Sequence, residues 1–297
     1  MLSRMRSFAF ALILLVVGGS VLAAEETTKP ATRPERKDVF APINPKLPTL
    51  WLIGDSTVRN GRDTGDNGQW GWGNPIAHYF DTTKINVQNR ALGGTSSRTY
   101  RNLGKWDEIL PLIKPGDYLM INFGHNDNAK LDDPARARGT LKGNGEETQE
   151  IDNPITKKHE VVHTYGWYIR QYIKEAKEKG VKEIVVLSLT PRNNWADGKA
   201  ARNTTYAVWA KQAAETAGVE FIDLNERTCE KLDAAGEQKS TELYYPEGEK
   251  LHPDWAGAVL NAESVVEGLK EIKGSTIASY LLANPPKDLK NPSGKAR

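Results

Sequence analysis

The sequence predicts an α/β fold in which a parallel β-sheet is covered by helices on both faces. Apolar runs of strand length alternate with segments of helical spacing along most of the chain, and turn or cap residues separate them. Strands that alternate with helices in this way run parallel, because each helix returns the chain to the same end of the sheet. Strands buried on both faces consist of continuous apolar residues, and residues 183–189 show this pattern.

The predicted elements can be placed in order along the chain. They are strands at 49–53 and 84–89, a short helix at 106–113, a strand at 118–123, a helix at 165–179, a strand at 183–189, a helix at 204–217, a strand at 219–223 and a final helix at 255–272. Gly180 and Gly218 follow two of the helices and are natural C-caps. Pro191 ends the strand before it, because proline cannot donate to a β-ladder.

Residues 128–163 interrupt this alternation. The segment has many charged residues and glycines and little apolar periodicity, which indicates a long loop. Loops of this length inside a compact domain are usually functional. We expect this loop to overhang the site that precedes it at 124–127 and to shape the choice of substrate. The alternative is a surface insertion without a role.

The first 24 residues have the composition of a signal peptide. Arg4 and Arg6 precede an apolar run at 8–21, and small residues follow at its end. We therefore predict export to a periplasm or to the outside; the alternative is an uncleaved membrane anchor. Residues 25–48 are predicted to be a flexible lead-in and residues 284–297 a disordered tail, which leaves one domain at 49–283.

Composition and charge exclude several other classes of function. The formal charge of the whole chain is +2, and Arg4 and Arg6 lie in the predicted signal peptide. The mature chain is therefore near neutral and gives no indication of a nucleic-acid or membrane partner. Its only cysteine, Cys229, excludes an internal disulfide and any metal site built from cysteines. Cys229 is expected to be a small apolar residue on a helix.

Four polar motifs lie beside predicted strand or helix ends. They are residues 54–57 (Gly-Asp-Ser-Thr), 91–98 (Ala-Leu-Gly-Gly-Thr-Ser-Ser-Arg), 124–127 (Gly-His-Asn-Asp) and 252–254 (His-Pro-Asp). Gly-Asp-Ser on its own is also an ordinary turn. Open α/β sheets bind their ligands at the carboxyl ends of the strands, so motifs in these places favour a catalytic site.

Together these motifs contain the groups that acyl transfer requires. Ser56 is the candidate nucleophile and His252 the candidate base, because a serine hydroxyl needs a neighbouring base to become nucleophilic. The backbone N–H groups of Ser56 and Gly94 and the side-chain amide of Asn126 are the candidate donors to the oxyanion. Gly94 suits this role because a residue without Cβ lets a ligand approach the main chain closely.

In order and content, these blocks resemble those of the GDSL, or SGNH, hydrolase superfamily. The longer versions, together with Gly-Trp-Gly at 71–73, are similar to its rhamnogalacturonan acetylesterase branch. The similarity covers roughly residues 49–269. The resemblance implies a flavodoxin-like three-layer α/β/α sandwich and serine esterase chemistry on an O-acyl carbohydrate, without a cofactor.

The chain departs from the superfamily pattern at one position. The family places an aspartate three residues before the catalytic histidine, and this sequence has Glu249 there. Glutamate can orient a histidine as aspartate does, so we predict that Glu249 orients His252. Two alternatives stay open: Asp254 takes this role, or a backbone carbonyl orients the ring. Asp254 is also a candidate N-cap of the last helix.

Several further polar and aromatic residues are candidates for substrate contact. Asp127 is expected to bond backbone groups or sugar hydroxyls, and Arg98 a uronate carboxylate, because the guanidinium group matches carboxylates in geometry. Trp72 and Trp195, with Trp70, are candidate sugar-stacking platforms. Each has a structural alternative, as an ion-pair partner or a core aromatic residue. No catalytic metal is predicted, because His125 has no second His or Cys at ligand spacing.

The motifs predict a serine esterase that works through an acyl-enzyme on Ser56. The resemblance implies that it removes O-acetyl groups from a plant-type polysaccharide, with rhamnogalacturonan as the expected polymer. An acetylesterase for xylan or another carbohydrate is the alternative with the same residues. An alternative of another class is a non-catalytic carbohydrate-binding relative, with Glu249 as a sign of a decayed triad. The expected partner is an acetylated polysaccharide or oligosaccharide.

Overall fold

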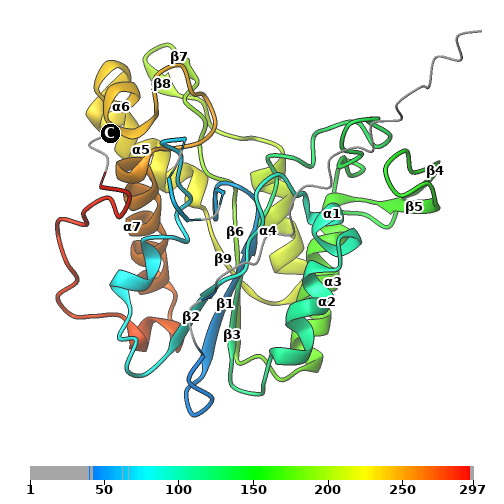
Figure 1. The fold of residues 1–297 in the computed structure, drawn as a ribbon, viewed down its shortest axis with the longest axis horizontal. Helices are drawn as coiled ribbons and strands as arrows, with labels where there is room; N and C mark the ends of the chain where they lie inside the picture. Colours follow the sequence, from blue (N-terminus) through cyan, green and yellow to red (C-terminus); the bar gives the residue numbers. More distant parts are fainter. Residues whose placement is uncertain (1–39, 41–42, 62, 66, 295–297) are drawn as a thin grey trace, which may run out of the picture. The chain divides into compact units, whose positions relative to one another are not determined.

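The computed structural model describes residues 40, 43–61, 63–65 and 67–294. A parallel sheet of five strands forms its centre, in the order β2-β1-β3-β6-β9 (Figure 1). The strands are β1 (Thr49–Gly54), β2 (Asn86–Asn89), β3 (Tyr118–Asn122), β6 (Glu183–Leu187) and β9 (Glu220–Ile222). Every neighbouring pair in this sheet is parallel, which confirms the predicted sheet.

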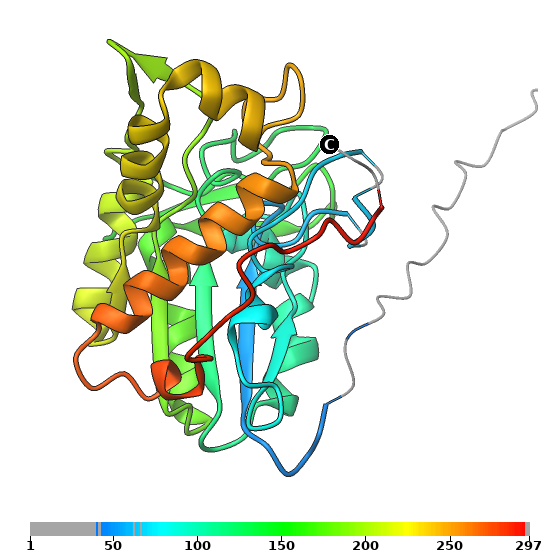
Figure 2. The same ribbon diagram turned by 90° about the vertical axis from the view of Figure 1, so that its left-hand side faces the viewer.

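Helices cover both faces of the sheet, so the fold is a three-layer α/β/α sandwich as predicted (Figures 1 and 2). One layer holds α1 (Ser97–Asn102), α2 (Lys105–Ile109), α3 (Tyr165–Glu178) and α4 (Tyr206–Ala217). The other holds α5 (Leu224–Ala235) and α7 (Trp255–Glu271), with α6 (Glu237–Tyr244) packed on α7. Three short 3₁₀ turns complete the fold: η1 (Ile76–Tyr79), η2 (Leu110–Leu112) and η3 (Ile277–Tyr280).

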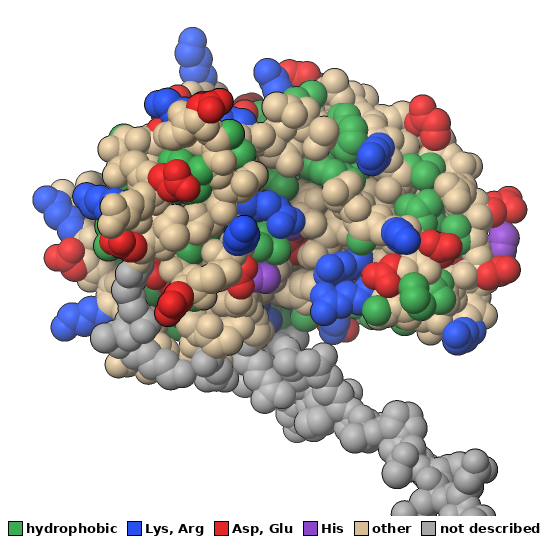
Figure 3. Space-filling view, turned by 90° about the horizontal axis from the view of Figure 1, so that it is seen from above, with side chains coloured by type: hydrophobic (Ala, Val, Ile, Leu, Met, Phe, Trp, Pro, Cys, Tyr) green, Lys and Arg blue, Asp and Glu red, His purple; other side chains and the backbone are tan. Residues whose placement is uncertain are grey.

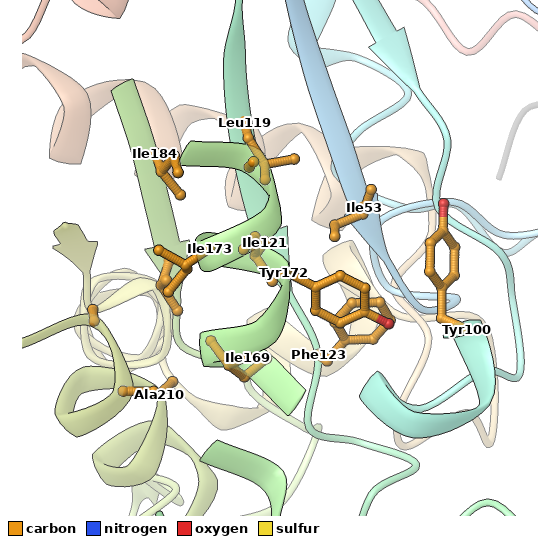
Figure 4. Close-up of a cluster of buried hydrophobic side chains, with 14 of the residues drawn as sticks. Ile53, Tyr100, Leu119, Ile121, Phe123, Ile169, Tyr172, Ile173, Ile184 and Ala210 are labelled. Carbon is orange, nitrogen blue, oxygen red and sulfur yellow. The ribbon is translucent and has the colours of Figure 1, made fainter. Parts of the chain in front are cut away.

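Alternation along the strands divides the core into two clusters. In β1, Trp51 and Ile53 point into the cluster under α1 to α4, whereas Leu50 and Leu52 point into the cluster under α7. This period of two follows from the pleat of the strand. Figure 4 shows Ile53 within the first cluster. Because both faces are covered, all six residues of β1 are buried.

Several elements were not predicted from the sequence. The expected long loop at 128–163 contains an antiparallel hairpin of β4 (Thr148–Asp152) and β5 (His159–His163). β4 is largely exposed and β5 has a single buried residue, Val162, so neither shows the apolar alternation that would indicate a strand. Helices α1, α5 and α6 and the short hairpin of β7 (Trp195–Ala196) and β8 (Lys199–Ala200) were also missed.

The two ends of the chain were predicted to be a signal peptide with a flexible lead-in, and a disordered tail. The signal peptide and most of the lead-in lie outside the described residues. At the other end the structure differs from the expectation: Leu289 packs against the core, and its carbonyl accepts a hydrogen bond of 2.7 Å from the indole of Trp255. None of the helices in the described ranges is long and apolar enough to span a membrane.

Strand order places the polar motifs at one edge. The chain leaves β1 toward β2 on one side and then crosses to β3 on the other, so β1 borders the switch point of the sheet. The motifs at 54–57, 91–98 and 124–127 directly follow β1, β2 and β3. The fourth motif immediately precedes α7. All three strand-end motifs therefore lie at the carboxyl ends of the strands, where open α/β sheets bind their ligands.

Candidate active site

A tight turn at the end of β1 presents Ser56. Gly54 ends the strand, and a Cβ there would lie 2.5 Å from the carbonyl oxygen of Asn122 on β3, so no larger residue fits. Oδ1 of the buried Asp55 accepts hydrogen bonds of 2.8 Å from both the N–H and the hydroxyl of Thr57, which fixes the turn. Burial raises the pKa of Asp55, and the hydrogen bonds from Thr57 oppose that effect. Asp55 is thus the residue that builds the turn.

The structure brings the three predicted catalytic side chains together. Oγ of Ser56 lies 2.8 Å from Nε2 of His252, although the two residues are far apart in the sequence. On the other edge of the imidazole, Nδ1 lies 3.4 Å from Oε2 of Glu249. This distance is that of an ion pair rather than a short hydrogen bond, and Nδ1 has no other polar partner among the described residues. The order Ser–His–carboxylate is that of a catalytic triad.

Glu249 is held in place from two sides. Its Oε1 accepts hydrogen bonds of 2.8–3.2 Å from the backbone N–H groups of Lys250, Leu251 and His252. Its Oε2 accepts one from the side-chain amide of Gln69. Partial burial alone would raise the pKa of Glu249, but the backbone hydrogen bonds and the charge of His252 outweigh it and lower the pKa. The carboxylate is therefore ionised and oriented behind the imidazole.

Asp254, the rival to Glu249, has a different position. It is the N-cap of α7, and its Oδ1 accepts a hydrogen bond of 2.9 Å from the N–H of Gly257. The carboxylate within ion-pair distance of His252 in the described structure belongs to Glu249. The extra methylene of glutamate is accommodated because the side chain folds back over the turn that it caps.

Two loops place the predicted oxyanion donors. Gly94 has φ +85°, a conformation that L-residues rarely adopt, so its backbone requires glycine. A Cβ on the preceding Gly93 would lie 3.5 Å from Cβ of Ser56, which puts this loop against the nucleophile. Nδ2 of Asn126 donates a hydrogen bond of 2.7 Å to the carbonyl of Thr95. One of its N–H bonds thus orients the amide, and the other is left for an oxyanion.

Three of the predicted substrate contacts are fully buried and are corrected by the structure. Trp72 has an exposed fraction of 0%, and its indole N–H donates to Oδ1 of Asn122 in the core. Arg98, also 0% exposed, forms a two-pronged ion pair with Glu160 of β5 at 2.6–2.7 Å. Neither side chain has exposed surface with which to contact a sugar. The uronate contact predicted for Arg98 was wrong because this carboxylate from the loop occupies it.

Asp127 is the third buried residue. Its carboxylate accepts hydrogen bonds from both the N–H and the hydroxyl of Ser97, the first residue of α1. Burial raises the pKa of Asp127 to about 7, and the hydrogen bonds from Ser97 oppose this shift. Of the two roles predicted for Asp127, the structure shows the bond to the backbone and leaves no exposed surface for a sugar hydroxyl.

The other aromatic candidates also pack against the protein. Trp70 is buried, with its ring edge-on to Trp255 at 4.9 Å between centroids. Trp195 is half-buried on β7, where it packs against Cys229 and its neighbours on α5, and its N–H donates to Asn193. A contact between Trp195 and substrate stays a prediction.

Three residues near the catalytic groups were missed by the sequence reasoning. Gln69 donates to Glu249, the backbone N–H of Asn193 donates to the carbonyl of Lys250, and Arg138 donates to the carbonyl of Gly94 at 3.2 Å. Gln69 lies two residues before the Gly-Trp-Gly block at 71–73, and this position is the one feature of the sequence that could have indicated a role for it near the site. Arg138 comes from the long loop, which therefore does approach the site, at the loop that carries Gly94, as predicted.

His125 has a hydroxyl partner within the protein. His125 is buried beside Asn126, and its Nε2 lies 3.1 Å from the hydroxyl of Thr190. Within the described ranges, no group of three or more His, Cys, Asp or Glu side chains is arranged to hold a metal ion. The residues instead form a nucleophile, a base, an orienting carboxylate and a set of hydrogen-bond donors, which is the equipment of acyl transfer.

Comparison with known proteins identifies the family of this chain. Residues 52–260 match the GDSL-like lipase/acylhydrolase family. A rhamnogalacturonan acetylesterase of Emericella nidulans is 30% identical over 74% of this chain and 84% of its own length. A probable rhamnogalacturonan acetylesterase of Bacillus subtilis, YesY, is 31% identical over 75% of this chain and 93% of its own length.

Solved structures agree with the fold. The crystal structure of protein YxiM from Bacillus subtilis superposes with a TM-score of 0.61 at 28% sequence identity, and the match covers 76% of this chain and 56% of that longer one. The Ser56–His252 pair and its surrounding donors lie inside the matched range of the family. This chain belongs to the GDSL-like lipase/acylhydrolase family and is a carboxylic ester hydrolase.

Proposed function

We propose that this protein removes O-acetyl groups from an acetylated polysaccharide, and that rhamnogalacturonan is its substrate. The observation that carries the proposal is the contact of 2.8 Å between Oγ of Ser56 and Nε2 of His252, with Glu249 behind the ring. The similarity to rhamnogalacturonan acetylesterases supports the choice of polymer. A decayed binding protein is disfavoured because nucleophile, base, carboxylate and donors are all in place.

The reaction proceeds in two acyl-transfer steps. His252 takes the proton of Ser56 as Oγ attacks the acetyl carbonyl, and the negative charge that develops on the carbonyl oxygen is bound by the N–H groups of Ser56, Gly94 and Asn126. The C–O bond to the sugar then breaks, and His252 protonates the sugar oxygen. In the second step His252 removes a proton from water as the water oxygen attacks the acetyl carbonyl of the acetyl-serine. The bond between that carbon and Oγ of Ser56 then breaks, His252 returns the proton to Oγ, and acetate leaves.

Glu249 has a defined role in both steps. An imidazole that accepts a proton at Nε2 becomes positively charged, and an ionised carboxylate beside Nδ1 stabilises that charge and fixes the tautomer. The lowered pKa of Glu249 keeps it ionised while His252 cycles between its two forms. No further cofactor is needed for this chemistry.

The proposal is tested by acetate release from matched polymers. Acetylated rhamnogalacturonan and acetylated xylan, adjusted to equal acetyl content, are incubated with the wild-type protein and with Ser56→Ala. We expect acetate from rhamnogalacturonan at the higher kcat/KM, and none above background with Ser56→Ala. Faster release of acetate from xylan would reject rhamnogalacturonan as the preferred polymer. Release of acetate from neither polymer would reject the proposal that the substrate is an acetylated polysaccharide.

We also propose that the protein acts outside the cytoplasm after removal of residues 1–24. The proposal rests on the charged, apolar and small-residue order of that segment. Expression of the full-length chain in a bacterial host, followed by fractionation and N-terminal sequencing, tests it. A mature protein that begins near residue 25 in the exported fraction is expected, and an intact chain in the cytoplasm contradicts it.

A further inference from the structure

A second feature at the carboxyl end of the sheet is a pocket beside the loop that carries Asn126. Its volume is about 510 Å³, and its lining includes His125, Lys142, Arg192, Asn203, Tyr206 and Trp209. This volume lies within the range of roughly 300–1,000 Å³ that small-ligand sites occupy. Gly124 and His125 form part of the wall and directly precede Asn126. The pocket therefore adjoins the catalytic centre.

The charges around this pocket are of one sign. Lys142 and Arg192 are both exposed, and within the part of the chain that the structure describes neither has a carboxylate within ion-pair distance. None of the residues that line the pocket is an Asp or Glu. Figure 3, seen from above, shows Lys and Arg side chains around the middle of this face. A pocket of this kind attracts an anion.

The backbone adds to the positive potential. Helix α4 begins at Tyr206, which lines the pocket, and its N-cap residue, Thr205, also lines it. The side chain of Thr205 makes no cap hydrogen bond. The positive end of the dipole of this twelve-residue helix thus faces the same space as Lys142 and Arg192.

Arg192 lies next to a residue that contacts the turn carrying Glu249 and His252. The next residue, Asn193, donates its backbone N–H to the carbonyl of Lys250 at 2.9 Å, two residues before His252. Burial lowers the pKa of His125 to about 3, and the positive charges of Arg192 and His252 add to this effect. Both groups are therefore close enough to His125 to interact with it electrostatically.

We propose that this pocket binds the carboxylate of a uronic acid residue that neighbours the acetylated sugar, with Arg192 and Lys142 as its partners. The guanidinium group of Arg192 matches a carboxylate in geometry, and Lys142 supplies a second, flexible charge. The partly exposed indole of Trp209 provides apolar surface for the sugar ring. This inference rests on the proposed function, because it names the part of the polysaccharide that the site selects.

In this proposal the binding of a uronate does not depend on Arg98, which is buried. The uronate contact that the sequence suggested for Arg98 is supplied by residues on two other segments, the long loop and the segment after β6. Both cations are exposed, so their attraction for a substrate is expected to weaken as salt is added.

The test compares esters that differ in charge. The value of kcat/KM is measured for acetylated galacturonate oligosaccharides and for acetylated xylo-oligosaccharides, with wild type, Lys142→Gln, Arg192→Gln and the double variant. The ratio of the two values is expected to fall about tenfold for each charge removed. Lys174→Gln, on the exposed surface of α3 and outside the pocket, is the matched control and should leave the ratio unchanged. An unchanged ratio in the double variant would overturn the inference.

A second measurement separates this inference from the proposed function. Unacetylated galacturonate oligosaccharide is used as an inhibitor of the hydrolysis of a small aryl acetate, which requires no polysaccharide activity. We expect competitive inhibition whose Ki rises about tenfold or more in the double variant and rises with salt in the wild type. Equal Ki values for wild type and double variant would refute the pocket as a uronate site, even if acetate release from polysaccharides is confirmed.

Discussion

Oε2 of Glu249 lies 3.4 Å from Nδ1 of His252, at the edge of the imidazole away from the nitrogen that contacts Ser56. The family pattern has an aspartate at this position. In this chain the longer side chain reaches the ring because its other oxygen caps the backbone of the turn that carries His252. One carboxylate therefore shapes the turn and orients the base.

Replacement of Glu249 by Gln keeps the size of the side chain and removes its charge. Without that charge the imidazolium form of His252 and the correct tautomer are less stable, so kcat is expected to fall by about 10²–10⁴. The measurement is kcat for an aryl acetate, with the melting temperature as a check on folding. A variant that folds and keeps kcat within a factor of about three would show that another group orients His252.

Gln69 is expected to be a positioning residue that acts through Glu249. Its own Oε1 accepts hydrogen bonds from Asn60 and Asn67 at 3.0 and 2.7 Å, so the amide that donates to Glu249 is held in one orientation. Replacement of Gln69 by Leu should lower kcat about tenfold, the cost of one hydrogen bond to a charged group, with little change in KM.

The matched control for Gln69 is Gln238→Leu, because Gln238 also donates to a glutamate but on the exposed surface of α6. This variant should keep both constants. A rise in KM without a fall in kcat for Gln69→Leu would indicate contact with substrate instead of a role in orienting the carboxylate.

The pH dependence of stability should contain a contribution from His125. Burial lowers its folded pKa to about 3 from an ordinary value of 6.5, so between these values the unfolded chain binds a proton that the folded protein does not. Stability is therefore lost as the pH falls from 6.5 toward 3, by up to about 4 kcal/mol from this group.

Comparison of two histidine variants isolates that contribution. Free energies of unfolding are measured by urea titration from pH 3 to pH 8 for wild type, His125→Gln and His78→Gln, the latter on an exposed surface. The curve should be flatter for His125→Gln at acid pH and unchanged in shape for His78→Gln. Parallel curves for wild type and His125→Gln would contradict the burial argument.

Arg98 is expected to contribute to stability. Its guanidinium is fully buried and pairs with Glu160, so Arg98→Met leaves a partly buried carboxylate without its partner and should cost about 3–5 kcal/mol of unfolding free energy. Lys105→Met, which breaks the exposed pair with Glu108, is the control and should cost less than about 1 kcal/mol. If Arg98→Met changed KM and left the stability unaltered, the result would support the contact between Arg98 and substrate that the sequence suggested.

Local patterns were sufficient to predict the sheet, the main helices and the side chains that meet at Ser56 and His252. β1, β3 and β6 are apolar runs that only a doubly covered sheet explains, and the motifs that hold Ser56 and Asn126 follow two of them directly. Helix α5 was missed because only Leu224, Cys229 and Leu232 supply apolar residues to its buried face. With so few apolar positions, its helical period is weak.

The wrong substrate contacts have a different cause. Arg98 and Glu160 are 62 residues apart in the sequence, and nothing local tells whether a charged side chain is exposed or is paired with a distant partner. For Trp72, the sequence alone does not distinguish a sugar-stacking platform from a core aromatic residue. Only the three-dimensional arrangement separates these alternatives, and it also supplies the pocket that local motifs did not indicate.

The most direct test of the catalytic account is covalent labelling of Ser56. The protein is treated with a fluorophosphonate and analysed by intact mass and peptide mapping, because an activated serine forms a stable adduct with this reagent. We expect one adduct per chain on Ser56, none with Ser56→Ala, and a much slower reaction with His252→Ala. A single adduct on another residue, or equal labelling of Ser56→Ala, would contradict Ser56 as the nucleophile.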